Sequence, residues 1–198
     1  MDADKWLAAV LAKIEAHIQN GTWVQAQPLP GRRAISSWWV FKVKCLSDSS
    51  IDKYKGCIVA QGFSQVWGIH YNEVFMLTAH LVAMQMVTAI VAIEDLKPES
   101  VGISTAFLNG DIDTEIYMKV PEGCEVDGEP QPGKDPKHWV VCLLKGLYGI
   151  KQGPRIWSLT LHSILPSLGF MRTDSSYSVY VHLHNDVWIM VLVYVDDR

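Results

Sequence analysis

Apolar residues recur every four positions near the start of the chain, at Trp6, Val10, Ile14 and Ile18. This spacing places them on one face of a helix. Asp4 before them is an acceptable N-cap, and the Asn-Gly pair at 20–21 is a fitting stop. The pattern predicts an amphipathic helix over residues 5–19.

The period of the pattern then changes from four residues to two. Between residues 35 and 46, one side of the predicted strand carries Trp39, Phe41 and Val43, and the other carries Lys42 and Lys44. The polar turn "SDSS" at 47–50 leads into a second strand over 51–60. Alternate residues of a strand point the same way, so one face of this second strand carries Lys53, Lys55 and Cys57. A hairpin with a basic side is predicted.

The rest of the chain mixes helical and strand patterns without strict alternation. We expect a buried helix over 80–94, a strand over 101–107, an exposed loop over 122–138, a strand over 139–144, a helix over 154–168 and a hairpin over 177–197. The helix over 154–168 would be weakened in its last turn by Pro166. This mixture predicts the α+β fold class.

Composition narrows the classes of function. The chain has 198 residues and 49% hydrophobic content, enough for one core or for one domain with a small lobe. With 17 basic and 21 acidic residues the net charge is −4, so contact with a polyanion would need a local basic patch. The four cysteines form no C-x-x-C pair, which argues against a zinc site or a disulfide framework. The start is acidic, and the apolar runs near 86–93 and 187–195 are too short to cross a bilayer, so we expect a soluble, intracellular protein without membrane contact.

Two adjacent carboxylates, Asp196 and Asp197, end an apolar run in "VYVDDR". Burying charge is costly, so acids at this place indicate either an exposed hairpin turn or a site for a divalent metal ion. The pattern alone leaves both interpretations open.

Seven stretches together resemble the reverse transcriptase of copia-type retrotransposons and occur in the same order. They are "NGTW" at 20–23, "WVFKVK" at 39–44, "KYKGCIVAQGFSQVWGIHYNEVF" at 53–75, "TAFLNGDIDTEIYMKVPEG" at 105–123, "KGLYGIKQGPRIW" at 145–157, "GFMRTDSSYSVY" at 169–180 and "YVDD" at 194–197. A lone Y-x-D-D is a weak signal, but seven ordered blocks over nearly the whole chain are a strong one.

The resemblance implies a right-hand polymerase with fingers and palm subdomains and with its thumb missing. It divides a single truncated reverse transcriptase domain, 1–198, into an N-terminal helix and lead-in (1–34), a fingers hairpin region (35–79) and a palm with further fingers elements (80–198). In this family three aspartates hold two Mg²⁺ ions, with Mn²⁺ as an alternative, for nucleotidyl transfer. Asp196 and Asp197 match two of these metal ligands and catalytic residues. The implied partners are an RNA or DNA template-primer and a deoxynucleoside triphosphate.

Three residues depart from the family pattern. Gly102 in "VGISTAFLNGD" stands where the family has its first metal-binding aspartate. Cys57 in "KYKGCIVAQGF" replaces an arginine that resembles the residue gripping the incoming triphosphate. His80 replaces a further arginine and is expected to cap or pack. Loss of a metal contact worth several kcal/mol would remove roughly a thousandfold or more of the rate.

The other family positions are intact. The resemblance assigns nucleotide binding to Lys53, Lys55, Phe107, Tyr148 and Gly149, and nucleic-acid binding to Lys151 and Arg155. For Phe107, a role as an aromatic residue of the core is an equal alternative to nucleotide binding. For Lys53 and Lys55, the equal alternative is that they only form a solvent-exposed face of the hairpin.

We therefore expect an RNA-directed DNA polymerase fragment that is inactive because of Gly102, Cys57 and the missing thumb, with weakened or lost metal binding. Two alternatives remain. One is a non-catalytic module that binds nucleic acid or protein, and the other is a decayed element without function. An exposed terminal strand would also permit self-association.

Overall fold

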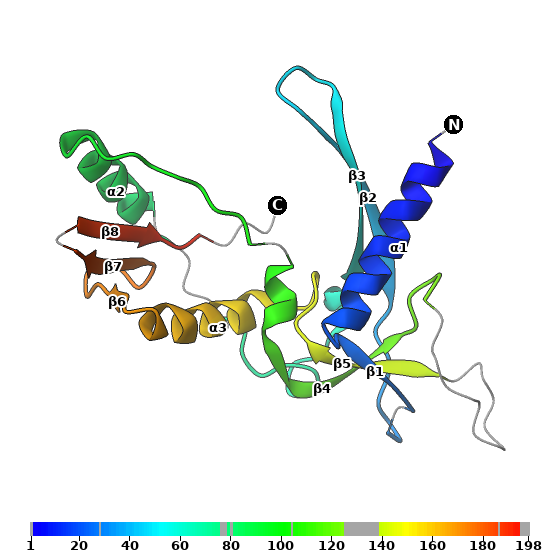
Figure 1. Cartoon of the computed structure of the whole chain (residues 1–198). Coiled ribbons are helices and arrows are strands. Elements are labelled where there is room, and N and C mark those ends of the chain that lie inside the picture. Colours follow the sequence, from blue (N-terminus) through cyan, green and yellow to red (C-terminus); the bar gives the residue numbers. More distant parts are fainter. Residues whose placement is uncertain are drawn as a thin grey trace. The chain divides into compact units, whose positions relative to one another are not determined.

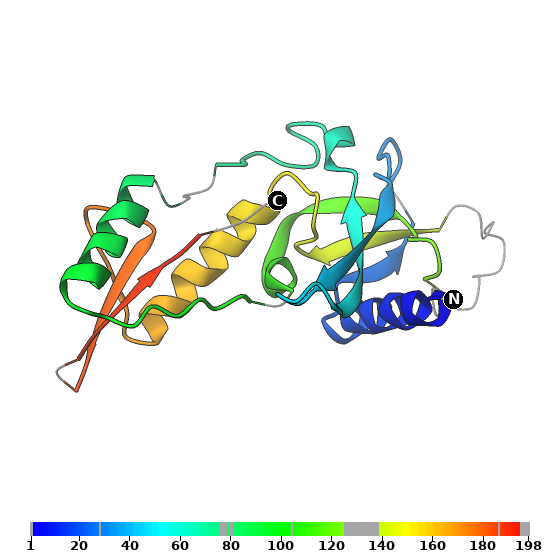
Figure 2. The same cartoon turned by 90° about the horizontal axis from the view of Figure 1, so that it is seen from above.

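The computed structural model describes residues 2–27, 29–75, 79, 81–103, 105–124, 139–185 and 187–194. The chain forms two compact units, each built from two segments (Figures 1 and 2). Unit 1 comprises Met1–Val74 and Phe107–Gly153, and unit 2 comprises Phe75–Ala106 and Pro154–Arg198. Each unit is described by itself.

Unit 1 contains one long helix and five strands. These are α1 (Ala3–Gln19), β1 (Trp23–Ala26), β2 (Ser37–Cys45), β3 (Ile51–Ala60), β4 (Asp111–Lys119) and β5 (Val140–Lys145). An antiparallel sheet has the order β1-β5-β4, and β2 pairs with β3 as a separate hairpin. Short 3₁₀ helices follow β3 at Gly62–Ser64 and precede β4 at Ala106–Asn109.

Aromatic contacts hold α1 against the hairpin, where Figure 1 shows the helix alongside β2 and β3. The Trp6 ring meets Phe41 edge-on at 5.3 Å and Tyr54 at 4.6 Å between ring centroids. The apolar stripe predicted for residues 5–19 thus supplies Trp6 as an anchor, although Ile18 at its other end is exposed. Such aromatic pairs contribute about 1 kcal/mol each beyond their buried area.

The hairpin and the three-stranded sheet of unit 1 share one core. Ile35, just before β2, donates its backbone N–H to Tyr117 O and accepts a hydrogen bond from Lys119 N, both at 2.8 Å. Buried core side chains come from β3, β4, β5, the 3₁₀ helix before β4 and the loop after β5: Ile58, Leu108, Ile116, Met118, Val141, Leu143, Leu147 and Ile150. Burial of one such side chain contributes roughly 2 kcal/mol.

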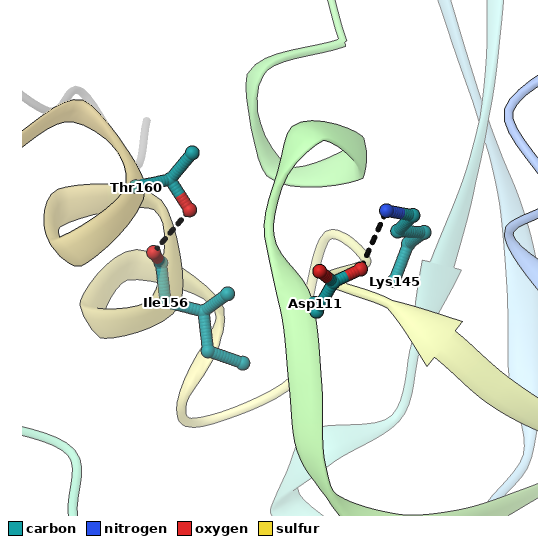
Figure 3. A network of polar contacts seen from close by, with 4 residues as sticks. All are labelled: Asp111, Lys145, Ile156 and Thr160. Atoms are coloured by element: carbon teal, nitrogen blue, oxygen red, sulfur yellow. Dashed lines mark hydrogen bonds and ion pairs between the residues drawn. The ribbon is translucent and has the colours of Figure 1, made fainter. Parts of the chain in front are cut away.

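Unit 2 contains α2 (Leu81–Ile93), α3 (Gly153–Ser167) and a sheet of order β6-β7-β8, formed by Met171–Arg172, Val179–His184 and Val187–Leu192. Buried Tyr180 on β7 hydrogen-bonds His162 Nδ1 on α3 through its hydroxyl group. Within α3, Thr160 Oγ1 donates to Ile156 O at 3.0 Å (Figure 3). Gly169 has φ +87°, and the neighbouring Phe170 N–H donates to Leu165 O, which closes the helix.

The α+β class predicted from the sequence is confirmed, because helices accompany antiparallel sheets in both units. The helices predicted at 5–19, 80–94 and 154–168, the hairpin of β2 and β3, the strand β5 and the hairpin of β7 and β8 are all present. The predicted exposed loop falls on residues 125–138 for most of its length and so lies outside the described residues.

Two predictions about the elements are wrong. Residues 101–103 form no strand, and the stretch ends instead in the 3₁₀ helix Ala106–Asn109, preceded by Thr105 at φ +54°. A positive φ interrupts the extended backbone that a strand requires. The helix α2 is also not buried: among its described residues only Ala83 is, whereas Val82 is 73% and Ile93 78% exposed.

Candidate functional site

The two aromatic residues assigned to nucleotide binding lie together in unit 1. Phe107, in the 3₁₀ helix before β4, meets Tyr148 edge-on with 4.5 Å between ring centroids and an interplanar angle of 83°. Phe107 is only 4% exposed, which gives it the packing of a core aromatic. A Cβ at Gly146 would come within 2.5 Å of Phe107 O, so this close approach requires glycine. Binding of a nucleotide by Phe107 stays a prediction.

Gly149 follows Tyr148 and packs its backbone directly on the end of β3. Ala60 N donates to Tyr148 O at 2.8 Å. Gly149 has φ +89°, and a Cβ there would lie 2.1 Å from Ala60 O. A Cβ on Gly62 would in turn lie 1.9 Å from Gly149 O. The Tyr-Gly loop and the "AQGF" stretch are therefore joined backbone to backbone.

A buried polar network, made of Gln65, His70 and Gln152, continues from this junction. Gln65 Nε2 donates to Gln152 Oε1 at 3.0 Å, and Gln152 Nε2 donates to His70 O at 2.8 Å. His70 Nδ1 accepts the backbone N–H of Val66 at 2.9 Å. All three members of the network are buried, and buried polar groups persist where they are hydrogen-bonded.

Lys151 lies at the edge of the buried polar network. Its backbone N–H donates to Gln65 Oε1 at 2.7 Å, and its Nζ donates to Gln65 O and to Tyr71 Oη, both at 3.2 Å. The ammonium group also lies 4.8 Å from the Tyr71 ring centroid. The structure thus gives Lys151 intramolecular partners, and its predicted contact with phosphate stays a prediction. Arg155 belongs to the first turn of α3 in unit 2, where it is half-buried.

The sequence prediction missed the three members of the buried polar network. The available signal was their position, because Gln65 and His70 lie in the block 53–75 and Gln152 lies in the block 145–157. Their mutual hydrogen bonds join two blocks that are more than eighty residues apart in the chain, which no local pattern reveals.

The basic side of the hairpin carries four lysines, which we call the lysine face: Lys42, Lys44, Lys53 and Lys55. The register places Lys42 directly opposite Lys55, and Lys44 opposite Lys53. All four are exposed. Like charges directly opposite each other on one face destabilise a strand pair, so this arrangement costs stability and attracts anions.

Cys57 shares the face of β3 that carries Lys53 and Lys55 and pairs with Val40 across the hairpin. Burial is the largest influence on Lys13 of α1 and lowers the pKa of its ammonium group, with Cys57 acting to raise that pKa and Lys55 to lower it. Lys13 therefore lies within electrostatic reach of Cys57 and Lys55 on β3. Cys57, which stands where the family has an arginine, thus lies in a basic environment.

The expected metal centre is described only in part. Gly102 is exposed, and a Cβ at this residue would meet no atom of the described residues within 4 Å. Asp196, Asp197 and His80 lie outside the described residues. Among the residues that are described, no group of three or more His, Cys, Asp or Glu side chains could hold a metal ion.

Asp111, an acid that follows the stretch 101–107, forms an ion pair within unit 1. Lys145 Nζ donates to Asp111 Oδ1 at 2.5 Å across the β4–β5 pair (Figure 3). Asp111 is 83% exposed at its side chain, so the pair contributes at most about 1 kcal/mol. The ion pair gives Asp111 an intramolecular partner.

Comparison with known proteins decides the family. The sequence profile described as "Reverse transcriptase (RNA-dependent DNA polymerase)" matches residues 20–198. The chain belongs to the reverse transcriptase family. It is 34% identical over 99% of its length to the "Retrovirus-related Pol polyprotein from transposon TNT 1-94" of Nicotiana tabacum. It is 33% identical over its whole length to the corresponding polyprotein from transposon RE2 of Arabidopsis thaliana.

These relatives confirm the copia-type resemblance of this reverse transcriptase domain. The chain spans only 14% and 13% of the two polyproteins, so their other activities are not attributed to it. No solved structure matches the domain. None of its described helices is both long and apolar enough to cross a membrane.

Proposed function

We propose that this chain is a fingers and palm portion of a copia-type reverse transcriptase whose two-metal centre is disabled by Gly102. The family places an aspartate at this position, and glycine offers no oxygen ligand. Mg²⁺ needs hard oxygen ligands in near-octahedral geometry. The residues of this chain therefore do not complete the family's ligand set, and we assign the chain no metal-dependent step.

The observation that carries this proposal is the space around Gly102. Its φ is not in the left-handed region, and a Cβ would contact none of the described atoms. An aspartate can therefore be accommodated there without backbone strain. The missing ligand is a consequence of residue type, so a single substitution should restore it.

The proposal is tested by measuring Mn²⁺ binding, followed through the electron paramagnetic resonance signal of the free ion. The unmodified chain should bind Mn²⁺ weakly. Gly102→Asp should raise the affinity by roughly tenfold or more. Asp196→Asn in the same variant should remove that gain, because the two carboxylates would hold the same ion. Asp95→Asn provides the matched control, since it removes one carboxylate that the family does not use.

Primer extension on a poly(rA) template with Mg²⁺ gives the second measurement. We expect no incorporation by the unmodified chain. Clear incorporation that disappears in the Asp196→Asn variant would show an intact centre and overturn the proposal. An unchanged Mn²⁺ affinity in the Gly102→Asp variant would instead show that residue 102 does not face the metal position.

The lysine face supports a second candidate function, binding of nucleic acid without catalysis. Four exposed ammonium groups lie on one side of the hairpin, and Trp38 on the same face is 53% exposed and available for base stacking. If four phosphates are neutralised, the affinity for a single strand should fall with salt with a logarithmic slope of about −3.

Salt titration against single-stranded RNA tests this function. Lys53→Gln with Lys55→Gln should reduce the slope by about 1.4, whereas Lys97→Gln with Lys119→Gln removes the same charge elsewhere and should leave it unchanged. Absence of binding at low salt would remove this candidate function.

A further inference from the structure

Two histidines share one face of β7 in unit 2. His182 and His184 are alternate residues of this strand, so their side chains point to the same side of the sheet β6-β7-β8. Their ring centroids are 5.8 Å apart, and the ring planes make an angle of 30°. Their cross-strand partners on β8 are the apolar residues Ile189 and Val187. Neither partner brings a charge that would compete with a cation for the two rings.

The His182 ring is held in a defined orientation and tautomer. Its Nδ1 lies 2.8 Å from Gly169 O. A carbonyl oxygen only accepts hydrogen bonds, so Nδ1 carries the proton and Nε2 keeps its lone pair. The ring also lies 5.1 Å from the Phe170 ring, and a Cβ on Gly169 would come within 2.9 Å of it. Hydrogen-bonding of one imidazole nitrogen to a backbone carbonyl is how metal-binding histidines are commonly oriented.

The His184 ring is exposed and is held only lightly. Its Nε2 lies 3.1 Å from Asn185 Nδ2, a contact between exposed neighbours. The Asn185 amide can donate to this nitrogen or, after a flip, accept from it, so His184 can adopt either tautomer. Rotation of the His184 ring can therefore turn its unprotonated nitrogen toward the side of His182 Nε2. The lone pairs of both rings can then face one ion.

We propose that His182 and His184 are the two protein ligands of a site for a divalent transition-metal ion of the Zn²⁺ class. Neutral imidazole binds Zn²⁺, Ni²⁺ and Cu²⁺ well, with metal–nitrogen distances of about 2.0–2.1 Å for Zn²⁺. Water completes the coordination of the ion. Mg²⁺ prefers oxygen ligands, so this site differs in chemistry from the carboxylate centre of the polymerase family.

Nickel is the probe for this site, because paramagnetic Ni²⁺ broadens the resonances of the imidazoles that bind it. Binding to the reduced full chain is measured by calorimetry, and imidazole resonances are followed by nuclear magnetic resonance. We expect selective broadening at His182 and His184, and an affinity that excess Mg²⁺ does not change. His184→Ala should lower the affinity by roughly tenfold or more. This exposed residue can be replaced without loss of core packing.

Leu183→Ala is the matched control, because Leu183 lies between the histidines and on the opposite face of β7. It should leave the Ni²⁺ affinity within about twofold of the unmodified chain. His182→Gln removes the second ligand, and its circular dichroism and thermal unfolding verify that the chain is folded. Broadening centred on other histidines, or unchanged affinity in the His184→Ala variant, would overturn the proposal.

Discussion

At Gly149 the backbone has a conformation and a position that only glycine can take. Its φ is +89°, and a Cβ would lie 2.1 Å from Ala60 O, closer than any real contact. We predict that Gly149→Ala lowers the free energy of unfolding by about 3 kcal/mol, combining backbone strain with displacement of β3. Urea unfolding followed by tryptophan fluorescence measures the loss.

Gly68→Ala separates the two causes. Gly68 also has a positive φ, +77°, but a Cβ there would meet none of the described atoms within 4 Å. This control should cost only about 1 kcal/mol, the contribution of strain alone. Equal losses in both variants would show that the contact between Gly149 and Ala60 is unimportant.

His17 is the residue at which stability depends most clearly on pH. Burial, and to a smaller extent the charge of Lys13, lowers the pKa of His17 from 6.5 to about 3. Its Nδ1 lies 3.1 Å from Thr22 Oγ1, and the ring stacks on Trp23 at 4.8 Å between centroids. The folded chain therefore holds His17 neutral in conditions where an unfolded chain protonates it.

The sign of the pH effect follows from this difference. Between about pH 3 and pH 6.5 the unfolded state binds the extra proton, so the contribution of His17 to stability rises with pH in this window and is constant above it. His17→Phe keeps an aromatic ring against Trp23 and removes the titration. Urea unfolding at several pH values should show a smaller slope for this variant in the acid range. An identical slope would contradict the assignment to His17.

At the scale of residues, the family blocks drew attention to positions whose packing the structure describes, and their assigned role in nucleotide binding stays a prediction. Phe107, Tyr148 and Gly149 were found from the family blocks, and the structure places the first two in contact and the third against β3. Gln65 and Gln152 were missed because their importance comes from mutual burial and hydrogen bonding across the chain. A lone glutamine in a sequence carries no sign of such a partner.

At the scale of elements, the sequence predicted those helices and strands in which apolar residues recur at one regular period. The helix α1, the hairpin of β2 and β3, and α3 follow from periods of four and two. The strand β4 was missed because its pairing register shifts between Asp111 and Ile116, and its burial changes from alternating to continuous. The burial of α2 was wrongly predicted from its apolar composition. Such a composition allows a helix to pack against other elements, but it does not show that the helix does so.

The lysine face lets stability and binding be separated within one element. Lys42 lies directly opposite Lys55, and Lys13 lies near Lys55. We predict that Lys55→Glu raises the free energy of unfolding by about 0.5 kcal/mol, because an attractive cross-strand pair replaces a repulsive one. The same change should weaken binding of single-stranded RNA several-fold and flatten its salt dependence.

Lys55→Gln is the matched control for this charge reversal. It removes the repulsion without adding attraction, so its effect on unfolding should be intermediate. Thermal and urea unfolding give the stability, and fluorescence anisotropy of labelled RNA gives the affinity. Lower stability in the Lys55→Glu variant would contradict a cost from the opposed lysines.

At the scale of the whole molecule, two of the three departures from the family pattern, Cys57 and Gly102, lie in different units. Cys57 belongs to unit 1 and Gly102 to unit 2, and the chain passes between the units three times. The net charge of −4 does not favour a triphosphate, so any affinity for one must come from local groups. Restoring each family residue singly tests the contribution of that residue to nucleotide affinity.

We predict that Cys57→Arg raises the affinity for a fluorescent deoxynucleoside triphosphate by roughly tenfold without Mg²⁺, through charge-assisted hydrogen bonds to phosphate. Gly102→Asp alone should raise it only when Mg²⁺ is present. No gain in the Cys57→Arg variant, or a gain in the Gly102→Asp variant without Mg²⁺, would contradict these predictions.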